Sequence, residues 1–373
     1  MFPNSLGNIL VSNLKYIKTM DIKVALLLMF FSCFMLNCNN SNTEKQISYF
    51  PSKVSLKGIK PNFINTDGIN PSNMNIYDSL IIVGSTYKKN GDNYIYIINN
   101  NTFQTITSAG RLGKGPSELT NPIRLTVNKS KGLLNVWDDA KRKIFVYNID
   151  SILKNPDSNP VNEIKITSEH GTIYEMIAWD DTIVTGGKGP ALLHFIDAKG
   201  RIKKIGLEHV TQDQISDRAF SKTLRKKMSV NETYKKLILG YRYYDRISLM
   251  NDKGEIEWSI TGPDNIKPNF RGLSPYNSKV GYSSTTSFDK YILGLYSGKE
   301  IGSYNQRGKF IPNYANEIHV LSLKGMLLGK FYLDREITSI EYDKNKNKLI
   351  ALESGSGNPF VIYDLPMNDF NSN

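Results

Sequence analysis

The chain has 373 residues, of which 40% are hydrophobic, so it can bury a large core of its own. Its 21 Tyr and 16 Phe favour strands and argue against a helical bundle. The formal net charge is +12, but the Lys and Arg residues are scattered through turns, which indicates a basic solvated surface and argues against a nucleic-acid-binding protein.

The first predicted element is a secretory signal. The apolar run from Val24 to Leu36 is too short to span a bilayer and has the length of the hydrophobic region of a signal. Cys38 follows this run, and a polar tether, residues 39–46, comes next. Bacterial lipoprotein signals resemble this layout, so we expect residues 1–38 to be a signal segment in which Cys38 is lipidated. The resemblance implies an exported lipoprotein, anchored in the bacterial outer membrane and facing the periplasm or the cell surface.

Alternatives to this anchor stay open. Cys33 is a rival acceptor, although lipidation there leaves the apolar residues 34–36 on the mature protein. A plain cleaved signal and an uncleaved signal anchor also fit the apolar run, and Met20 is an alternative start. Since the chain's two cysteines lie in this segment, the mature domain is expected to have no disulfide and no cysteine metal ligand.

Six repeats of about fifty residues follow the tether. Each contains a short apolar run between turns rich in Asp, Asn or Lys, which is typical of a strand that is buried on both faces. These second strands of the repeats are expected at residues 80–84, 133–137, 182–186, 237–241, 291–295 and 349–352.

A third strand and a polar turn complete the pattern. The turns 197–200 and 251–254 end in Gly, which supplies the left-handed conformation that closes a hairpin into a fourth strand. Four antiparallel strands per repeat make a propeller blade. We therefore predict an all-β fold, a six-bladed β-propeller of four-stranded antiparallel blades over residues 47–366, followed by a C-terminal tail, residues 367–373. The third strands are expected at residues 94–98, 144–147, 194–196, 247–250, 318–321 and 360–363.

The last repeat ends after its third strand, at about residue 363. The segment Lys53–Lys57 precedes the first blade and has strand character. We predict that this N-terminal strand completes the last blade, because closing the ring removes the exposed edge that an open array would leave.

One junction between repeats resembles a known family. Residues 110–119 read GRLGKGPSEL, and Asn121-Pro122 follow. This Gly-rich, Gly-Pro-x-Glu motif is similar to the blade junction of the six-bladed TolB-like propeller lipoproteins and, more distantly, of NHL-type propellers. The resemblance implies the propeller fold for roughly residues 47–365 but implies no particular activity.

A binding surface is expected at the rim of the central channel, where the loops between second and third strands meet the connections between blades. Arginine and tyrosine are the residue types that dominate binding hot spots. We therefore expect a binding or scaffold protein that engages a protein, peptide or glycan, rather than nucleic acid, through this rim and the loop 297–313. The candidate ligand-binding residues are Arg111, Lys114, Arg124, Lys141, Arg142, Arg242, Tyr243 and Tyr244.

An enzyme is the competing hypothesis, specifically a metal-dependent hydrolase or lyase with its site at the channel mouth. Neither a phosphate-loop spacing nor a Gly-x-Ser-x-Gly elbow occurs in the sequence. The four histidines fall at unrelated positions in the repeat, and the acidic candidates do not converge as a set. We accordingly predict no catalytic residue, metal or cofactor. The acidic candidates are Asp138, Asp139, Asp180, Asp181, Asp245 and Glu353.

Overall fold

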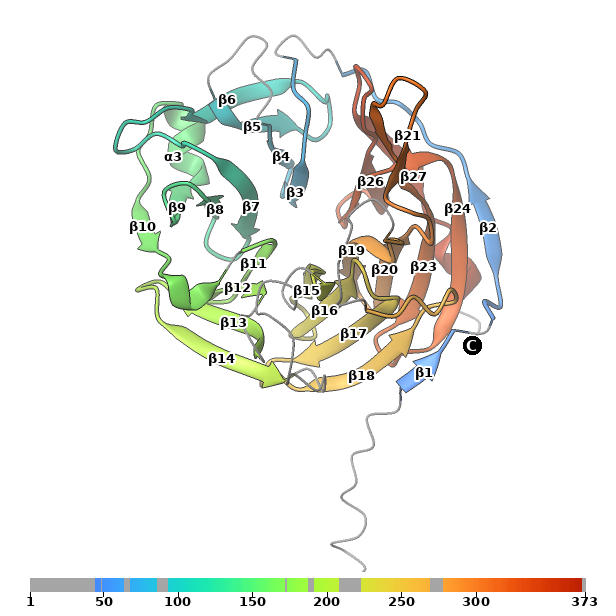
Figure 1. Cartoon of the computed structure of the whole chain (residues 1–373). Helices are drawn as coiled ribbons and strands as arrows, with labels where there is room; N and C mark the ends of the chain where they lie inside the picture. Colours follow the sequence, from blue (N-terminus) through green and yellow to red (C-terminus); the bar gives the residue numbers. More distant parts are fainter. Residues whose placement is uncertain are drawn as a thin grey trace, which may run out of the picture. The chain divides into compact units, whose positions relative to one another are not determined.

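Six antiparallel sheets surround a central channel in the computed structural model of the chain (Figure 1). The structure describes residues 44–47, 49–63, 68–85, 93–171, 173–186, 191–207, 223–268 and 278–370. The predicted signal segment, with Cys33 and Cys38, lies outside these residues. Within the described residues, blades one to five each have four antiparallel strands and blade six has three, so the prediction of an all-β, six-bladed propeller is confirmed.

Within each blade the strands follow chain order from the channel outward. Blade one consists of β3 (Asn73–Tyr77), β4 (Leu80–Gly84), β5 (Asn93–Asn99) and β6 (Thr105–Arg111). Blade two consists of β7 (Pro122–Asn128), β8 (Leu133–Asp138), β9 (Lys143–Asn148) and β10 (Asn162–Lys165). Blade three consists of β11 (Met176–Trp179), β12 (Thr182–Gly186), β13 (Ala191–Asp197) and β14 (Ile202–Leu207).

The second half of the ring repeats this order. Blade four consists of β15 (Lys226–Asn231), β16 (Lys236–Tyr241), β17 (Arg246–Asn251) and β18 (Ile256–Thr261). Blade five consists of β19 (Tyr282–Phe288), β20 (Tyr291–Tyr296), β23 (Ala315–Ser322) and β24 (Leu327–Ile337). Blade six consists of β25 (Ser339–Asp343), β26 (Lys348–Leu352) and β27 (Phe360–Asp364).

The remaining described elements are short. A hairpin of β21 (Gly302–Tyr304) and β22 (Phe310–Pro312) is inserted in blade five, and α3 (Ile149–Lys154) connects β9 to β10. Two 3₁₀ turns span Ser168–His170 and Met367–Phe370. No helix in the described part of the chain is both long and apolar enough to cross a membrane.

The second strands are apolar because neighbouring sheets cover both of their faces. All five residues of β4 and all six of β20 are buried. Side chains of adjacent blades share one core, since Ile95 of blade one and Phe145 of blade two belong to the same hydrophobic cluster. This packing accounts for the continuous apolar runs that identified the repeats.

The predicted polar turns also form as expected. Gly200 and Gly254 adopt φ of 79° and 81°, the left-handed region that favours glycine. In the first turn the Asp197 carboxylate accepts hydrogen bonds from the backbone N–H groups of Lys199 and Arg201. These local bonds fix the hairpin that leads into the fourth strand.

The N-terminal segment reaches the last blade, but not in the predicted register. Ile59 exchanges two backbone hydrogen bonds of 2.8 Å with Ile362 of β27, which joins the two ends of the chain. The predicted closing strand instead forms β2 (Lys53–Leu56), which pairs in parallel with β24 of blade five. Before it, β1 (Glu44–Gln46) pairs in parallel with β18 of blade four.

The prediction that Lys53–Lys57 completes blade six is therefore corrected. The long strand β24 offers an outer edge that needs a partner, and β2 supplies it. In this position Leu56 is buried in the core that also contains Phe331 and Val361. The described residues from Glu44 to Lys60, called here the N-terminal strap, thus follow the outside of blades four and five before reaching blade six (Figure 1).

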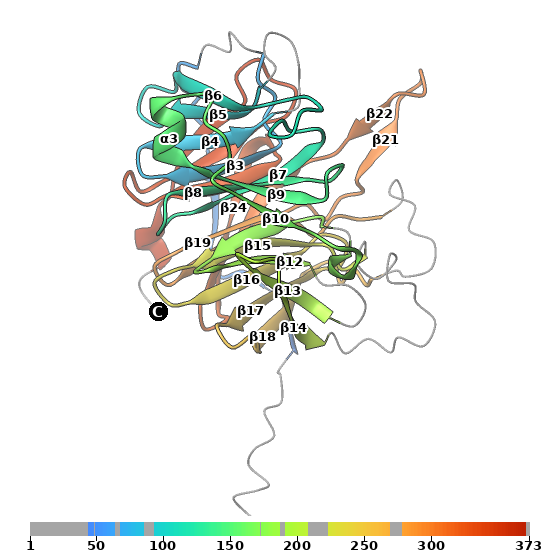
Figure 2. The same cartoon turned by 90° about the vertical axis from the view of Figure 1, so that its left-hand side faces the viewer.

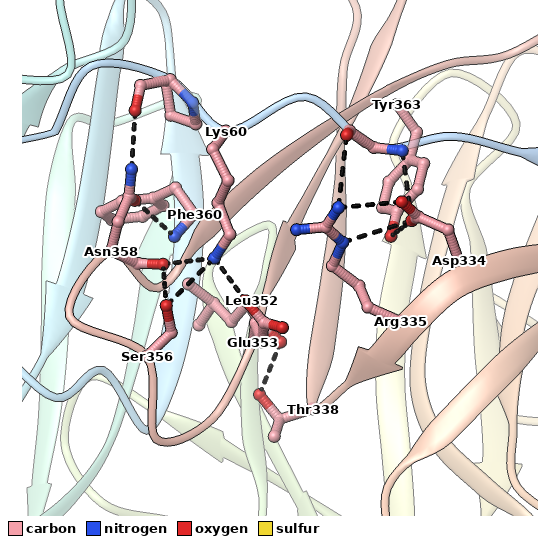
Figure 3. A network of polar contacts seen from close by, with 12 residues as sticks. Lys60, Asp334, Arg335, Thr338, Leu352, Glu353, Ser356, Asn358, Phe360 and Tyr363 are labelled. Atoms are coloured by element: carbon pink, nitrogen blue, oxygen red, sulfur yellow. Dashed lines mark hydrogen bonds and ion pairs between the residues drawn. The ribbon is translucent and has the colours of Figure 1, made fainter.

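Polar contacts hold the end of the strap on blade six (Figure 3). The Lys60 ammonium group contacts the Glu353 carboxylate and the backbone carbonyl of Asn358. Beside it, the Asp334 carboxylate accepts hydrogen bonds from the Gly58 backbone N–H, at 3.1 Å, and from the Tyr363 hydroxyl, at 3.0 Å. Glu353, an acidic candidate of the enzyme hypothesis, is therefore engaged in closing the ring.

Candidate functional site at the channel rim

The first strand of every blade lines the central channel, which contains a cavity of about 150 Å³ (Figure 1). All of these inner strands run in the same direction along the channel, because each occupies the same place in its blade. Residues at the N-terminal ends of the inner strands therefore gather at one mouth of the channel. The connections between blades and the loops between second and third strands lie at this mouth, which is the predicted rim.

Four charged side chains converge at this mouth. Glu175 directly precedes β11, and its Oε1 atom lies 3.1 Å from an Arg124 guanidinium nitrogen on β7. The same oxygen lies 3.1 Å from a guanidinium nitrogen of Arg225 and 2.6 Å from the Lys227 ammonium nitrogen. The four side chains are 14 to 21% exposed, so they are shielded from bulk water. We call Arg124, Glu175, Arg225 and Lys227 the rim cluster.

The repeat brings these residues together. Arg124 and Glu175 are 51 positions apart, and Glu175 and Lys227 are 52 positions apart. A hydrogen bond between the same two inner strands has the same spacing. The backbone N–H of Ala178 donates to the side-chain hydroxyl of Thr126, 52 residues away. Residues one repeat apart occupy equivalent sites on adjacent inner strands, so their side chains meet across the channel wall.

Further contacts orient the cations of the rim cluster. The Arg124 guanidinium donates to the backbone carbonyls of Tyr174, at 2.8 Å, and Ile123, at 2.6 Å. The Arg225 guanidinium lies 5.5 Å from the centre of the Tyr174 ring, a cation–π distance. Both guanidinium groups are thus fixed independently of Glu175.

The cluster strongly perturbs its own ionisation. Burial on its own raises the pKa of Glu175, but the Arg124, Lys227 and Arg225 charges outweigh it and hold that pKa far below the ordinary value. Burial lowers the pKa of Lys227, and the nearby arginines lower it further, while Glu175 opposes them. Both pKa shifts indicate that the single Glu175 carboxylate is surrounded by more positive charge than it can neutralise.

The opposite mouth has a different character. Lys129, after β7, lies 3.7 Å from a Glu341 carboxylate oxygen on β25. Burial raises the pKa of Glu341, and the charge of Glu232, after β15, acts in the same direction. Between the two mouths, blades five and six contribute hydroxyl-bearing side chains to the wall. These are Ser284, Thr285, Thr286, Ser287, Thr338 and Ser339.

Two of the predicted rim residues belong to this site. Arg124 is a member of the rim cluster, as described above. Arg242 lies at its edge, because its backbone N–H donates to the Arg225 carbonyl at 2.8 Å. Burial lowers the pKa of Arg225, and the charges of Arg124 and Arg242 act in the same direction. The Arg242 guanidinium also lies over the Tyr243 ring, 5.6 Å from its centre, which places Tyr243 beside the site.

Other predicted rim residues hold loops in place. The Lys141 ammonium group donates to the backbone carbonyls of Gly115, Pro116 and Glu118. The Arg142 guanidinium donates to the carbonyls of Thr167 and Gly171. Their hydrogen-bonding capacity is largely used within the protein.

The last three predicted residues do not join the rim cluster. Arg111 is 72% exposed and lies 3.6 Å from Glu118, and Lys114 is exposed in the same junction. Tyr244 is buried in the core, where its ring packs edge-on against Tyr241. The predicted role of Tyr244 in ligand binding stays a prediction, and in the structure core packing covers its ring.

The Gly-Pro-x-Glu junction has a structural explanation. The Glu118 side chain folds back, and its Oε2 atom accepts a hydrogen bond of 2.7 Å from the Gly115 N–H. A Cβ atom at Gly113 would lie 2.0 Å from that oxygen. The motif therefore builds a compact crossing between blades one and two, clamped from outside by Lys141.

Three acidic candidates of the enzyme hypothesis, Asp138, Asp245 and Glu353, have structural partners. The Asp138 carboxylate accepts hydrogen bonds from the backbone N–H groups of Thr120 and Lys141. Asp245 is buried and accepts from the Tyr296 hydroxyl at 3.1 Å. Among the described residues, no three His, Cys, Asp or Glu side chains lie together as a metal site requires.

Sequence reasoning missed Glu175, Arg225 and Lys227. They belong to inner strands or precede them, whereas the sequence-based rim consists of the loops between second and third strands and the connections between blades. The signal that could have found them is the repeat itself, because charged residues at matching positions of three consecutive inner strands must face one another.

Comparison with known proteins supports the fold. A member of the DUF4221 family from Bacteroides vulgatus has a TM-score of 0.55 at 12% identity, covering 84% of this chain and 98% of its own. A Bacteroides fragilis protein named as exported has a TM-score of 0.50 at 10% identity, covering 86% and 97%. At such identities the likeness is one of fold alone, and no curated protein matches the sequence. The family model described as TolB-like 6-blade propeller-like matches residues 60–345, which is more than half of the chain, so this protein belongs to the TolB-like six-bladed propeller family.

Proposed function

We propose that this protein is a non-enzymatic, lipid-anchored binding propeller that engages a ligand at the channel rim. The observation that carries this proposal is the rim cluster, in which Arg124, Arg225 and Lys227 surround Glu175 at the mouth of the channel. Partly buried charges in surplus are costly for folding and are typical of a site that serves binding. Protein, peptide and glycan were the ligand classes expected from the sequence.

The hairpin β21–β22 favours a protein among these classes. It connects the second and third strands of blade five, so it arises on the rim side, and it projects away from the blades (Figure 2). Tyr304 and Ile311 on this hairpin are 55% and 47% exposed. A protein partner seated on the rim would bury these side chains together with the channel mouth.

Capture experiments test the binding role. Envelope extract is passed over the immobilised chain and over a Tyr304→Ser, Ile311→Ser variant. Tyr234→Ser is the matched control, because Tyr234 is 50% exposed in the turn between β15 and β16, at the opposite mouth. We expect the control to recover the same partner as the unmodified chain and the hairpin variant to lose it. Equal recovery by all three proteins contradicts a binding surface on the rim face.

The lipid anchor at Cys38 is a separate part of the proposal, supported by the signal-like sequence before it and the polar tether after it. We expect the chain to incorporate radiolabelled palmitate and to partition into detergent. Cys38→Ser should abolish both properties, and Cys33→Ser should leave them intact. Loss of labelling only in Cys33→Ser would move the anchor to that residue, and no labelling in the unmodified chain would refute it.

The metal-dependent hydrolase or lyase remains the competing class. No observation on the described residues favours it, since Asp138, Asp245 and Glu353 are bonded to groups of the protein itself and no three candidate metal ligands lie together there.

A further inference from the structure

The rim cluster has a surplus of positive charge. Arg124, Arg225 and the protonated form of Lys227 contribute three positive charges and Glu175 one negative charge, which leaves a surplus of two. Burial lowers the pKa of Lys227 to about 7, so the surplus is two below that pH and falls to one above it. Arg242 stands at the edge of the cluster and adds another. Because these groups are partly shielded from water, the surplus is only weakly screened by salt.

Hydrogen-bond donors in the cluster also remain unused. Arg225 reaches Glu175 through one terminal nitrogen, while its Nε atom is buried and has no hydrogen-bond partner among the described residues. Lys227 donates one hydrogen bond, to Glu175, of the three that an ammonium group can donate. All three cations meet Glu175 at one atom, Oε1, so they converge on a single point.

The channel wall next to the cluster provides more donors. Ser229 lies two residues after Lys227 on β15, and no described residue forms a hydrogen bond with its buried hydroxyl. The hydroxyls of Thr285 and Ser287, on the inner strand β19 of the next blade, are also buried and have no hydrogen-bond partner among the described residues. All three residues line the channel cavity. Hydroxyl groups beside unpaired cationic donors suit an anion with several oxygen atoms, which can accept from all of them.

We propose that the rim cluster binds an anionic group with several oxygens, a carboxylate or a phosphate, between Arg225, Lys227 and Ser229. Glu175 is the internal anion of this site: it holds the cations at one point and competes with the incoming anion for them. This inference rests on the proposed binding role, since it names the chemistry of the ligand group that enters the rim.

Titration calorimetry of the purified chain at low ionic strength tests the site, with inorganic phosphate in one arm and acetate in the other. Binding in either arm supports the inference and identifies the preferred anion, and absence of binding in both overturns it. Arg225→Met and Lys227→Met should each weaken binding about tenfold or more, because each removes charge-assisted hydrogen bonds. Lys253→Met is the matched control. It also removes one positive charge, but from the exposed turn between β17 and β18, the outer two strands of blade four.

Glu175→Gln should change the anion affinity in the opposite direction from Arg225→Met and Lys227→Met. The amide keeps the volume and an acceptor for Lys227 but removes the competing charge, so binding should become several-fold tighter. Thermal unfolding of each variant confirms that it is folded, and a variant that fails to fold leaves the others to decide. Weaker binding by folded Glu175→Gln, or equal weakening by Lys253→Met and Arg225→Met, overturns the proposal. Anion binding without any captured partner would instead refute only the proposed role in partner binding.

Discussion

Asp245 is a buried carboxylic acid between blades four and five, and its ionisation should weaken the fold. It lies just before β17 and is fully buried, and it accepts hydrogen bonds from the Tyr296 hydroxyl and the Asp264 backbone N–H. Within the part of the chain that the structure describes, its Oδ1 atom has no hydrogen-bond partner. Burial raises the pKa of Asp245 from 3.8 to about 6, with the nearby Asp264 charge acting in the same direction.

The sign of the effect follows from proton binding. Between pH 3.8 and about 6 the folded state retains a proton on Asp245 that the unfolded chain releases, so stability falls as the pH rises through this window. A shift of about two pKa units corresponds to about 3 kcal/mol, which is lost by pH 7. Asp245→Asn cannot ionise and should lack this loss.

Urea unfolding followed by circular dichroism at pH 4, 5, 6, 7 and 8 measures the difference. We expect the stability of Asp245→Asn relative to the unmodified chain to increase by about 2 kcal/mol from pH 4 to pH 8, whatever constant offset the amide introduces, because part of the total is already lost at pH 4. Asp252→Asn, in an exposed turn, is the control and should leave the pH dependence unchanged. Parallel stability curves for Asp245→Asn and the unmodified chain would refute the reasoning.

Two further predictions concern the strap and the blade junction. Leu56→Ala should cost about 2–3 kcal/mol of unfolding free energy, because it opens a cavity in the core beneath β2, whereas the exposed Ser55→Ala should change it by less than about 0.5 kcal/mol. Similar urea midpoints for these two variants would place β2 elsewhere. Gly113→Ala should cost about 1–2 kcal/mol in thermal or urea unfolding, because the new Cβ displaces Glu118 from its hydrogen bond. Gly357→Ala meets no atom within 4 Å and should be nearly neutral, so a comparable loss there would remove the explanation of the motif.

The repeats were predictable from the sequence because their signal is local. A strand covered on both faces must be apolar throughout, and a tight turn needs Gly or Asn at its left-handed position. The residues of each repeat are therefore sufficient to predict the strands of that blade. The runs at Leu80–Gly84 and Tyr291–Tyr296 became fully buried strands for this reason.

The sequence alone thus determined the number of blades, the order of their strands and the presence of a strap before the first blade. Only the tertiary structure decided where the strap pairs. Backbone hydrogen bonds at a sheet edge are nearly independent of side chains, so the sequence of β2 does not say whether it pairs with β24 or with β27. The folded ring decides for β24, because that strand has a long free edge and the core beside it accepts Leu56. The rim cluster depended on the ring in the same way, because Arg124, Glu175 and Lys227 become neighbours only when their three blades stand side by side.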